Sequence, residues 1–225
     1  MSNPKIVTLD GPAGVGKSTL AKDLAQELGL PFLDSGAMFR LLAIELGDSA
    51  LELPEDKLES KLADFHFSLQ GCGSASQLYC NGNLAGAEIR TEEVAFLAAK
   101  LGALPAVRKA LKEAQRQIGA NTSLVTEGRD MGTTIFPRAV CKFFLDATPE
   151  ERARRRCRQL EEAGEMADYS TVLNQIISRD AQDRNRKESP LRPARDAILV
   201  DTTSRTIDQV LAQLLEHARP LLQKR

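Results

Sequence analysis

Gly11-Pro12-Ala13-Gly14-Val15-Gly16-Lys17-Ser18 sets the expected architecture of this 225-residue chain. A short apolar run, residues 6–9, precedes this stretch, and Leu20, Leu24 and Leu28 follow it at helical spacing. The pattern GxxxxGK(S/T) between a strand and a helix is typical of a phosphate-binding loop. Backbone N–H groups of such a loop converge on phosphate oxygens at a helix N-terminus, where the helix dipole also favours negative charge. The sequence therefore predicts a site for a nucleoside triphosphate.

Each residue of the loop has an expected part in this site. We expect the nucleotide to contact Gly11, Pro12, Ala13, Gly14, Val15, Gly16, Lys17, Ser18 and Thr19. Lys17 should reach the β- and γ-phosphates, and the Ser18 hydroxyl should ligate Mg²⁺. Mg²⁺ bound with the triphosphate is thus the expected cofactor, and Ser18 is its expected protein ligand.

The elements around the loop predict an α/β protein with a P-loop NTPase fold, in which helices flank a parallel β-sheet. Further strands are expected at residues 31–33, 123–126, 140–145 and 197–200. Helices are expected over 91–118 with a break at Pro105, over 170–186 and over 207–222. Residues 64–88 alternate around Gly and Ser turns, and Asn81-Gly82 is a strong hairpin signal. This region predicts a small antiparallel insert.

The composition limits the classes of protein and partner. Lys and Arg total 30 against 31 Asp and Glu, a formal net charge of -1, and 42% of the residues are hydrophobic. Such a chain is a poor general binder of duplex nucleic acid and has no apolar run long enough for a membrane span. The first residues show no secretory pattern, and the four cysteines form no CxxC pair. We expect a cytoplasmic monomer that binds small molecules and neither nucleic acid nor membrane.

A phosphate-binding loop leaves three classes open: a signalling GTPase, an ATP-driven motor or chaperone, and a small-molecule kinase. A GTPase needs a guanine-reading Asn-Lys-x-Asp after a late strand, and the late strand here ends in Leu145-Asp146-Ala147-Thr148 instead. Asp146 has two interpretations, a Mg²⁺-related carboxylate or a structural residue at the strand end. The next helix is dense in arginine, and this density favours neutralisation of charge on a nucleotide.

Arginine gathers in the last third of the chain. The residues are Arg152, Arg154, Arg155, Arg156, Arg158, Arg179, Arg184, Arg186, Arg192 and Arg195. A capping box with proline at the first helical position, residues 148–151, begins the helix that carries the first five. Glu150 with Arg154 and Glu151 with Arg155 have the (i, i+4) spacing of surface ion pairs. Two interpretations stay open, a mobile lid that clamps phosphates and an ordinary charged helix.

Two further charged groups point to a ligand. Arg179, Asp183 and Arg186 form one helix stripe, which suits sugar hydroxyls and phosphates or, equally, an internal ladder of ion pairs. Arg129 and Asp130 follow a buried strand at the carboxyl edge of the sheet, where open parallel sheets bind ligands. Burying an arginine without a partner is costly in free energy, so an arginine at this edge favours the interpretation as a ligand-binding residue.

Six motifs together resemble, in order and spacing, the bacterial cytidylate kinases. They are DGPAGVGK (10–17), DSGAMFR (34–40), EIRT (88–91), PAVR (105–108), EGRDMGT (127–133) and RDAQDRNR (179–186). The resemblance covers nearly the whole chain, and it implies a nucleoside monophosphate kinase fold with a parallel core, an arginine-rich lid and an enlarged monophosphate-binding insert. We therefore expect a single domain, 1–225, with its core at 1–60 and 95–225, the insert at about 61–94 and the lid at about 149–168.

The resemblance implies phosphorylation of CMP and dCMP by ATP and Mg²⁺ through in-line phosphoryl transfer, in pyrimidine nucleotide metabolism. The implied CMP-binding residues are Ser35, Arg40, Arg108, Arg129, Asp130, Arg179, Asp183 and Arg186. Arg40 and Arg129 would hold the phosphate. Arg108 and Asp130 would read the cytosine, while Arg179 and Asp183 would bind the sugar. The expected catalytic residues, which neutralise charge during transfer, are Lys17, Arg129, Arg155 and Arg156.

The chemistry of cytosine agrees with this assignment. Its N4 amino donor lies beside acceptors at N3 and O2, so a carboxylate with an arginine complements it, whereas uracil would set a carbonyl against Asp130. This chain has Phe96 and Ala99 where relatives commonly place asparagine and serine, and Phe39 where tyrosine is common. The alternatives are a related P-loop kinase that prefers UMP or another small acceptor, and a nucleotide-sensing protein that uses the lid as a switch.

Overall fold

The computed structural model describes residues 3–223, so residues 1, 2, 224 and 225 of the expected domain lie outside it. The strands are β1 (Ile6–Asp10), β2 (Phe32–Asp34), β3 (Phe67–Gln70), β4 (Gln77–Cys80), β5 (Asn83–Leu84), β6 (Leu124–Gly128), β7 (Cys141–Asp146) and β8 (Ile198–Asp201). The α-helices are α1 (Lys17–Leu28), α2 (Ser35–Leu46), α3 (Glu55–Ala63), α4 (Glu92–Leu101), α5 (Pro105–Asn121), α6 (Pro149–Glu162), α7 (Tyr169–Arg184) and α8 (Ile207–Gln223). Short helical turns are η1 (Asp48–Glu52), η2 (Gly73–Ala75), η3 (Ala87–Arg90) and η4 (Met131–Ile135).

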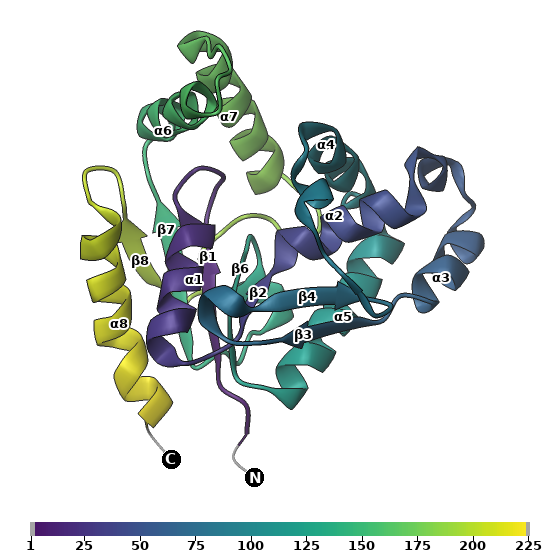
Figure 1. Ribbon diagram of the computed structural model, residues 1–225, viewed down its shortest axis with the longest axis horizontal. Helices are drawn as coiled ribbons and strands as arrows, with labels where there is room; N and C mark the ends of the chain where they lie inside the picture. The colour runs from purple at the N-terminus through teal and green to yellow at the C-terminus, as the bar shows by residue number, and fades with distance from the viewer. Residues whose placement is uncertain (1–2, 224–225) are drawn as a thin grey trace.

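Five parallel strands form the central sheet in the order β2-β6-β1-β7-β8. The first strand, β1, lies in the middle of the sheet, and all five of its residues are buried. Such continuous burial is typical of a parallel strand with helices on both faces of its sheet. Figure 1 shows α1 and α8 at one side of this sheet and α2 and α5 at the other. The predicted α/β fold with a helix-flanked parallel sheet is confirmed.

Two apolar clusters hold the helices on the sheet. Val7 and Leu9 of β1 belong to a cluster with residues of α1 and α8, whereas Ile6 belongs to a second cluster with residues of α2, α4 and α5. The alternation follows from the strand period, because successive side chains point to opposite faces. Leu20 and Leu24 of α1 are fully buried, and burial of one such side chain contributes about 2 kcal/mol.

The predicted antiparallel insert is a three-stranded sheet in the order β3-β4-β5. Asn81 and Gly82 make its turn with φ angles of 50° and 82°, as the Asn-Gly signal predicts. Helix α3, which precedes this sheet, was not expected from the sequence. Its buried residues are Leu58 and Leu62, one turn apart, and the rest of its pattern is too polar to show an apolar face. The limits of the insert, 61–94, stay a prediction.

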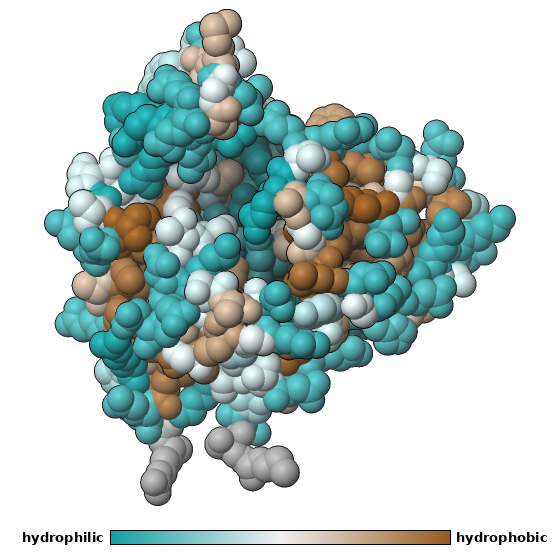
Figure 2. All heavy atoms as spheres, viewed as in Figure 1, coloured by the Kyte–Doolittle hydropathy of each residue, from teal (hydrophilic) through white to brown (hydrophobic). Residues whose placement is uncertain are grey.

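Helices α6 and α7 pack against each other and rise above the carboxyl edge of the sheet (Figure 1). Half of the predicted capping box at the start of α6 is present: Thr148 Oγ1 accepts a hydrogen bond from the Glu151 N–H at 3.3 Å, whereas the Thr148 N–H donates to Thr203 Oγ1 and not to Glu151. Ala153, Cys157 and Val172 form a small apolar cluster between the two helices. Figure 2 shows a strongly hydrophilic surface over this helical pair and a hollow beneath it.

Candidate active site

A cavity of about 860 Å³ lies between the helical pair α6–α7, the carboxyl edge of the sheet and helices α4 and α5. All eight implied CMP-binding residues are on its wall, together with Lys17 and Ser18 of the phosphate-binding loop. Of the insert residues 61–94, Arg90 is the one on this wall. The cavity therefore brings the expected donor and acceptor sites into one space, built from segments that are far apart in the sequence.

The phosphate-binding loop takes the shape that its glycines allow. Gly11 has a φ of +151°, and a Cβ atom there would lie 2.1 Å from the main-chain oxygen of Leu145 on the neighbouring strand. Gly16 caps α1 in the left-handed region, with a φ of 87° and no side-chain hydrogen bond to the helix. The first N–H groups of α1 are thus left for an anion, as a helix N-terminus requires.

Lys17 is buried, and its ammonium group donates to the main-chain oxygen of Pro12 at 2.7 Å. The pKa of Lys17 is lowered to about 7, mainly by burial and then by the positive charge of Arg129, while Glu127 and Asp10 act in the opposite direction. In the ligand-free protein the lysine is therefore held against its own loop and loses its charge readily. A phosphate group near the loop would supply the anion that favours the charged form.

Ser18 and Glu127 meet at the base of the loop. The Ser18 hydroxyl donates to Glu127 Oε1 at 2.8 Å, and the Glu127 side chain is buried. Burial raises the pKa of Glu127, as does the negative charge of Asp34. Sequence reasoning placed Glu127 at the end of a buried strand and gave it no role. The missing information is the strand order, because β6 lies next to β1 and so brings this carboxylate to the loop.

The contacts of Asp146 agree with its interpretation as a structural residue at the strand end. Its Oδ1 accepts from the Ala147 N–H at 2.9 Å, and its Oδ2 lies 3.6 Å from a guanidinium nitrogen of Arg184. The carboxylate thus closes the turn after β7 and pairs with a residue of α7.

Asp183 lies between two guanidinium groups, but one of them differs from the sequence expectation. Its carboxylate, 1% exposed, accepts from Arg129 Nε at 2.9 Å and from the Arg186 guanidinium. The stripe on α7 had suggested Arg179 and Arg186 as the two partners. Arg129 occupies the place expected for Arg179 because the end of β6 lies under α7 in the folded chain. Asp183 thereby fixes two of the arginines on the cavity wall.

Arg40 and Arg179 add positive charge to the same wall. Within residues 3–223, neither has a carboxylate at ion-pair distance. Burial lowers the pKa of Arg179, and the charges of Arg129 and Arg40 lower it further. Three neighbouring guanidinium groups, with Asp183 bonded to one of them, make this part of the cavity a site for an anion such as a phosphate.

Asp130 and Arg108 lie at the far end of the cavity. Their charged groups are 3.8 Å apart, and the Asp130 Oδ2 atom is buried without a hydrogen-bond partner among the described residues. The turn η4 that follows Asp130 is held by Asp10, which accepts from the N–H groups of Met131 and Gly132 at 2.8 Å each. Burial raises the pKa of Asp10 to about 6, although these two bonds oppose the shift. Asp130 is thus on the cavity wall with an oxygen that accepts no hydrogen bond from the described residues.

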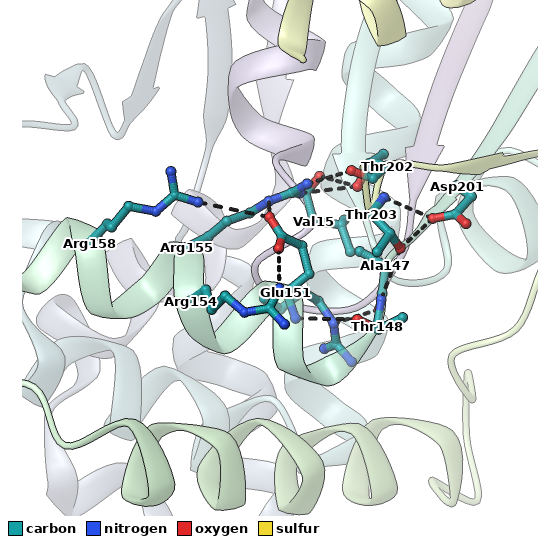
Figure 3. Close-up of polar contacts among 11 residues, drawn as sticks. Val15, Ala147, Thr148, Glu151, Arg154, Arg155, Arg158, Asp201, Thr202 and Thr203 are labelled. Atoms are coloured by element: carbon teal, nitrogen blue, oxygen red, sulfur yellow. Dashed lines mark hydrogen bonds and ion pairs between the residues drawn. The ribbon is translucent and has the colours of Figure 1, made fainter. Parts of the chain in front are cut away.

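The arginines of α6 all have protein partners in this structure, and Figure 3 shows three of them around Glu151. Arg154 donates to this carboxylate at 2.7 Å, in place of the expected pair with Glu150. Arg155 donates to the same carboxylate at 3.1 Å, as the spacing predicts, and also to Thr202 Oγ1 at 3.1 Å. Arg158 lies 3.9 Å from it. The catalytic roles expected for Arg155 and Arg156 stay predictions.

The parallel sheet, the glycine-rich loop and the buried lysine at the mouth of a cation-lined cavity define a P-loop kinase. The cytidylate kinase family model matches residues 7–220, and the chain belongs to the cytidylate kinase family.

Two relatives show how close this likeness is. The chain is 55% identical over 215 residues to the cytidylate kinase of Oleidesulfovibrio alaskensis, with 96% of this chain and 98% of the relative covered. It is 56% identical over 215 residues to the cytidylate kinase of Nitratidesulfovibrio vulgaris, with 96% and 93% covered.

A solved structure of an uncharacterised protein from Eubacterium ventriosum is similar in fold. It has a TM-score of 0.55 and 13% identity, over 96% of this chain and 98% of that one. At this identity the likeness supports the fold alone. No helix within residues 3–223 is both long and apolar enough to cross a membrane.

Proposed function

We propose that this protein transfers the γ-phosphoryl group of ATP to CMP and dCMP, with CDP or dCDP and ADP as products. Membership of the cytidylate kinase family supports the reaction. The observation that carries the choice of base is the buried Asp130 Oδ2 atom, which has no donor among the described residues and lies beside Arg108. Cytosine offers an amino donor to this carboxylate and ring acceptors to the guanidinium, whereas the C4 carbonyl of uracil would repel Asp130.

The acceptor phosphate fits the cluster of Arg40, Arg129 and Arg179. The phosphate oxygen that attacks ATP is already an anion, so the reaction needs no general base. These arginines therefore act by position and charge: they hold the acceptor phosphate and offset repulsion between the two nucleotides. Asp183, which already binds Arg129, is the carboxylate next to them that a sugar hydroxyl would reach.

Ser18 and Glu127 are the residues that would hold Mg²⁺ with ATP. Their hydroxyl and carboxylate oxygens lie 2.8 Å apart, and both are the hard donors that Mg²⁺ prefers. When bound with ATP, Mg²⁺ neutralises charge on the β- and γ-phosphates.

Lys17 and the arginines of the lid complete the proposed mechanism. Lys17 would leave the Pro12 carbonyl for the ATP phosphates. Arg155 and Arg156 would exchange their protein partners for phosphate oxygens when the lid, residues 149–168, closes. Closure would also exclude water, which suppresses hydrolysis of ATP and strengthens each charged contact.

An ADP-release assay tests this function. Mg-ATP is supplied with CMP, dCMP, UMP, AMP or no acceptor, and Lys17→Ala is run beside the wild type. We expect CMP and dCMP to support turnover, UMP to do so poorly, and Lys17→Ala to lower turnover by at least about a hundredfold, since one charged donor to a transition state contributes about that much. If no monophosphate raises ADP release, the kinase proposal is wrong; if UMP is preferred, the assignment of the base is wrong.

A further inference from the structure

The wall that α4 contributes to the cavity carries no polar side chain. Its residues there are Ala95, Ala98 and Ala99, followed by Gly102 and Ala103 after the helix. Phe96 points away from this wall, since it is 64% exposed and lies under the Lys100 ammonium group at 4.4 Å. Side-chain hydrogen bonds to a base cannot come from this wall, whereas α5 and the turn that follows β6 do carry polar side chains on the cavity wall.

Gln115 is one of the polar residues that α5 places on the cavity wall, together with Arg108 and Lys112. Arg108, Leu111 and Gln115 follow one another at i, i+3 and i+7, and all three are on the cavity wall. The Gln115 side chain is 1% exposed, and its Oε1 atom has no hydrogen-bond partner among the described residues. An unpaired buried amide destabilises the folded protein, so its presence needs an explanation.

Gln115 is not required to join α5 to the turn η4. The neighbouring Arg116 makes that connection, because it donates to the main-chain oxygens of Ile135 at 3.0 Å and Thr134 at 2.9 Å. The Gln115 carboxamide is thus free to pair with whatever fills the cavity.

Asp130 Oδ2 and Gln115 Oε1 are two buried acceptors without donors on the wall of one cavity. The exocyclic amino group of cytosine carries two N–H bonds in the plane of the ring, and one group of this kind can satisfy two acceptors. We propose that Gln115 is a second base-reading residue, whose carboxamide oxygen accepts one N4–H of cytosine while Asp130 accepts the other. The inference rests on the proposed function, since it assumes that the acceptor is CMP.

The two acceptors differ in what they do with uracil. A carboxylate cannot donate to the C4 carbonyl, whereas a carboxamide can turn by half a rotation and offer its NH₂ group. Gln115 therefore adds affinity for cytosine, and Asp130 excludes uracil. In the proposed complex Gln115 supplies a polar contact to the base, whereas the alanine side chains of α4 have no polar atoms to supply one.

Gln115→Met tests the proposal, with Gln117→Met as its control. Methionine keeps the length of the side chain, and Gln117 is an exposed residue of the same helix. We expect Gln115→Met to raise the KM for CMP about tenfold, the usual effect of one lost hydrogen bond to a buried partner. The kcat and the KM for ATP should stay within about twofold of the wild type, as should every constant of Gln117→Met. An unchanged KM for CMP in Gln115→Met overturns the proposal.

A second substrate separates this role from a packing effect. N4-methyl-CMP keeps one N–H, so the wild type should use it about tenfold less well than CMP. In Gln115→Met that difference should disappear, whereas a steric penalty against the methyl group would persist. Equal use of both substrates by the wild type also overturns the proposal, and this arm needs no variant. A wild type that fails to phosphorylate CMP at all would instead refute the proposed function.

Discussion

Arg152 of α6 and Asp180 of α7 form an ion pair with two hydrogen bonds, in which Nη1 donates to Oδ1 at 2.9 Å and Nη2 donates to Oδ2 at 2.5 Å. The Arg152 side chain is 1% exposed. It also donates to the main-chain oxygens of Ala147 at 3.0 Å and of Ala13 in the phosphate-binding loop at 3.2 Å. One buried guanidinium therefore ties the helical pair α6–α7 to the loop, and Arg152 is a structural member of the arginine cluster.

Asp180→Ala should destabilise the protein strongly. The substitution leaves a buried guanidinium without its carboxylate, and such a loss lowers the free energy of unfolding by about 3 kcal/mol. Urea unfolding with an unchanged m-value measures this change. Arg154→Ala is the matched control. The Arg154 side chain is 59% exposed, so its ion pair with Glu151 contributes less than about 1 kcal/mol to the free energy of unfolding. Similar losses in the two variants would contradict a special role for the buried pair.

Binding of ATP should take up a proton above neutral pH. The pKa of Lys17 in the ligand-free protein is lowered to about 7, so at pH 8 the amine is mostly neutral. Phosphates stabilise the charged form, and binding should then take up about 0.9 of a proton at pH 8 and little below pH 6. Titration calorimetry in two buffers of different ionisation enthalpy measures the uptake. Lys17→Met should abolish it, and uptake that survives in this variant must come from another group.

Arg156 offers a test of the expected catalytic role of the lid. Its guanidinium lies 2.7 Å from the Glu92 carboxylate of α4, and the glutamate side chain is 86% exposed. Such a pair contributes less than about 1 kcal/mol, so Arg156 can leave it at small cost. We expect Arg156→Ala to lower kcat at least about tenfold. Glu92→Ala should leave kcat within about twofold. Equal losses in steady-state assays of both variants would assign the effect to the ion pair and not to a contact with ATP.

Asp130→Asn should weaken the preference for cytosine. The carboxamide keeps an oxygen acceptor for the N4 amino group, but it can also donate to the C4 carbonyl of uracil. We expect the ratio of kcat/KM for CMP to that for UMP to fall by about tenfold or more. Competition between the two monophosphates in one reaction, followed by chromatography of the diphosphates, measures the ratio directly. A ratio equal to that of the wild type would mean that Asp130 does not read the base.

The phosphate-binding loop could be predicted from sequence because its geometry is local. Eight consecutive residues between a strand and a helix determine it, and the positive φ angles of Gly11, Gly14 and Gly16 agree with the pattern. The partner of Asp183 could not be predicted in this way. Helical spacing favours Arg179, which is four residues away, but the nearest guanidinium besides Arg186 comes from Arg129, which is 54 residues away. The position of Arg129 depends on how the sheet and α7 pack, and a linear pattern does not contain that information.

Glu127 and Gln115 show two further limits of the sequence. An acidic residue at the end of a strand gains a role only when the strand order is known, since two neighbouring strands are 118 residues apart at the start of their pairing. A glutamine in a helix usually faces solvent, and nothing in its spacing reveals an unpaired amide inside a cavity. The motifs thus indicated which residues line the cavity, while the pairing of their charges required the fold.

Glu127 connects two segments of the cavity wall, because it accepts hydrogen bonds from residues of both α1 and α2. Its carboxylate accepts from Ser18 at 2.8 Å, and its main-chain oxygen accepts from Ser35 at 2.7 Å. Ser18 is expected to contact ATP and Ser35 to contact CMP, so a single residue of a buried strand would set the spacing between the two proposed binding sites. In the proposed reaction, the distance that the phosphoryl group travels would then depend on the sheet and not on the position of the lid.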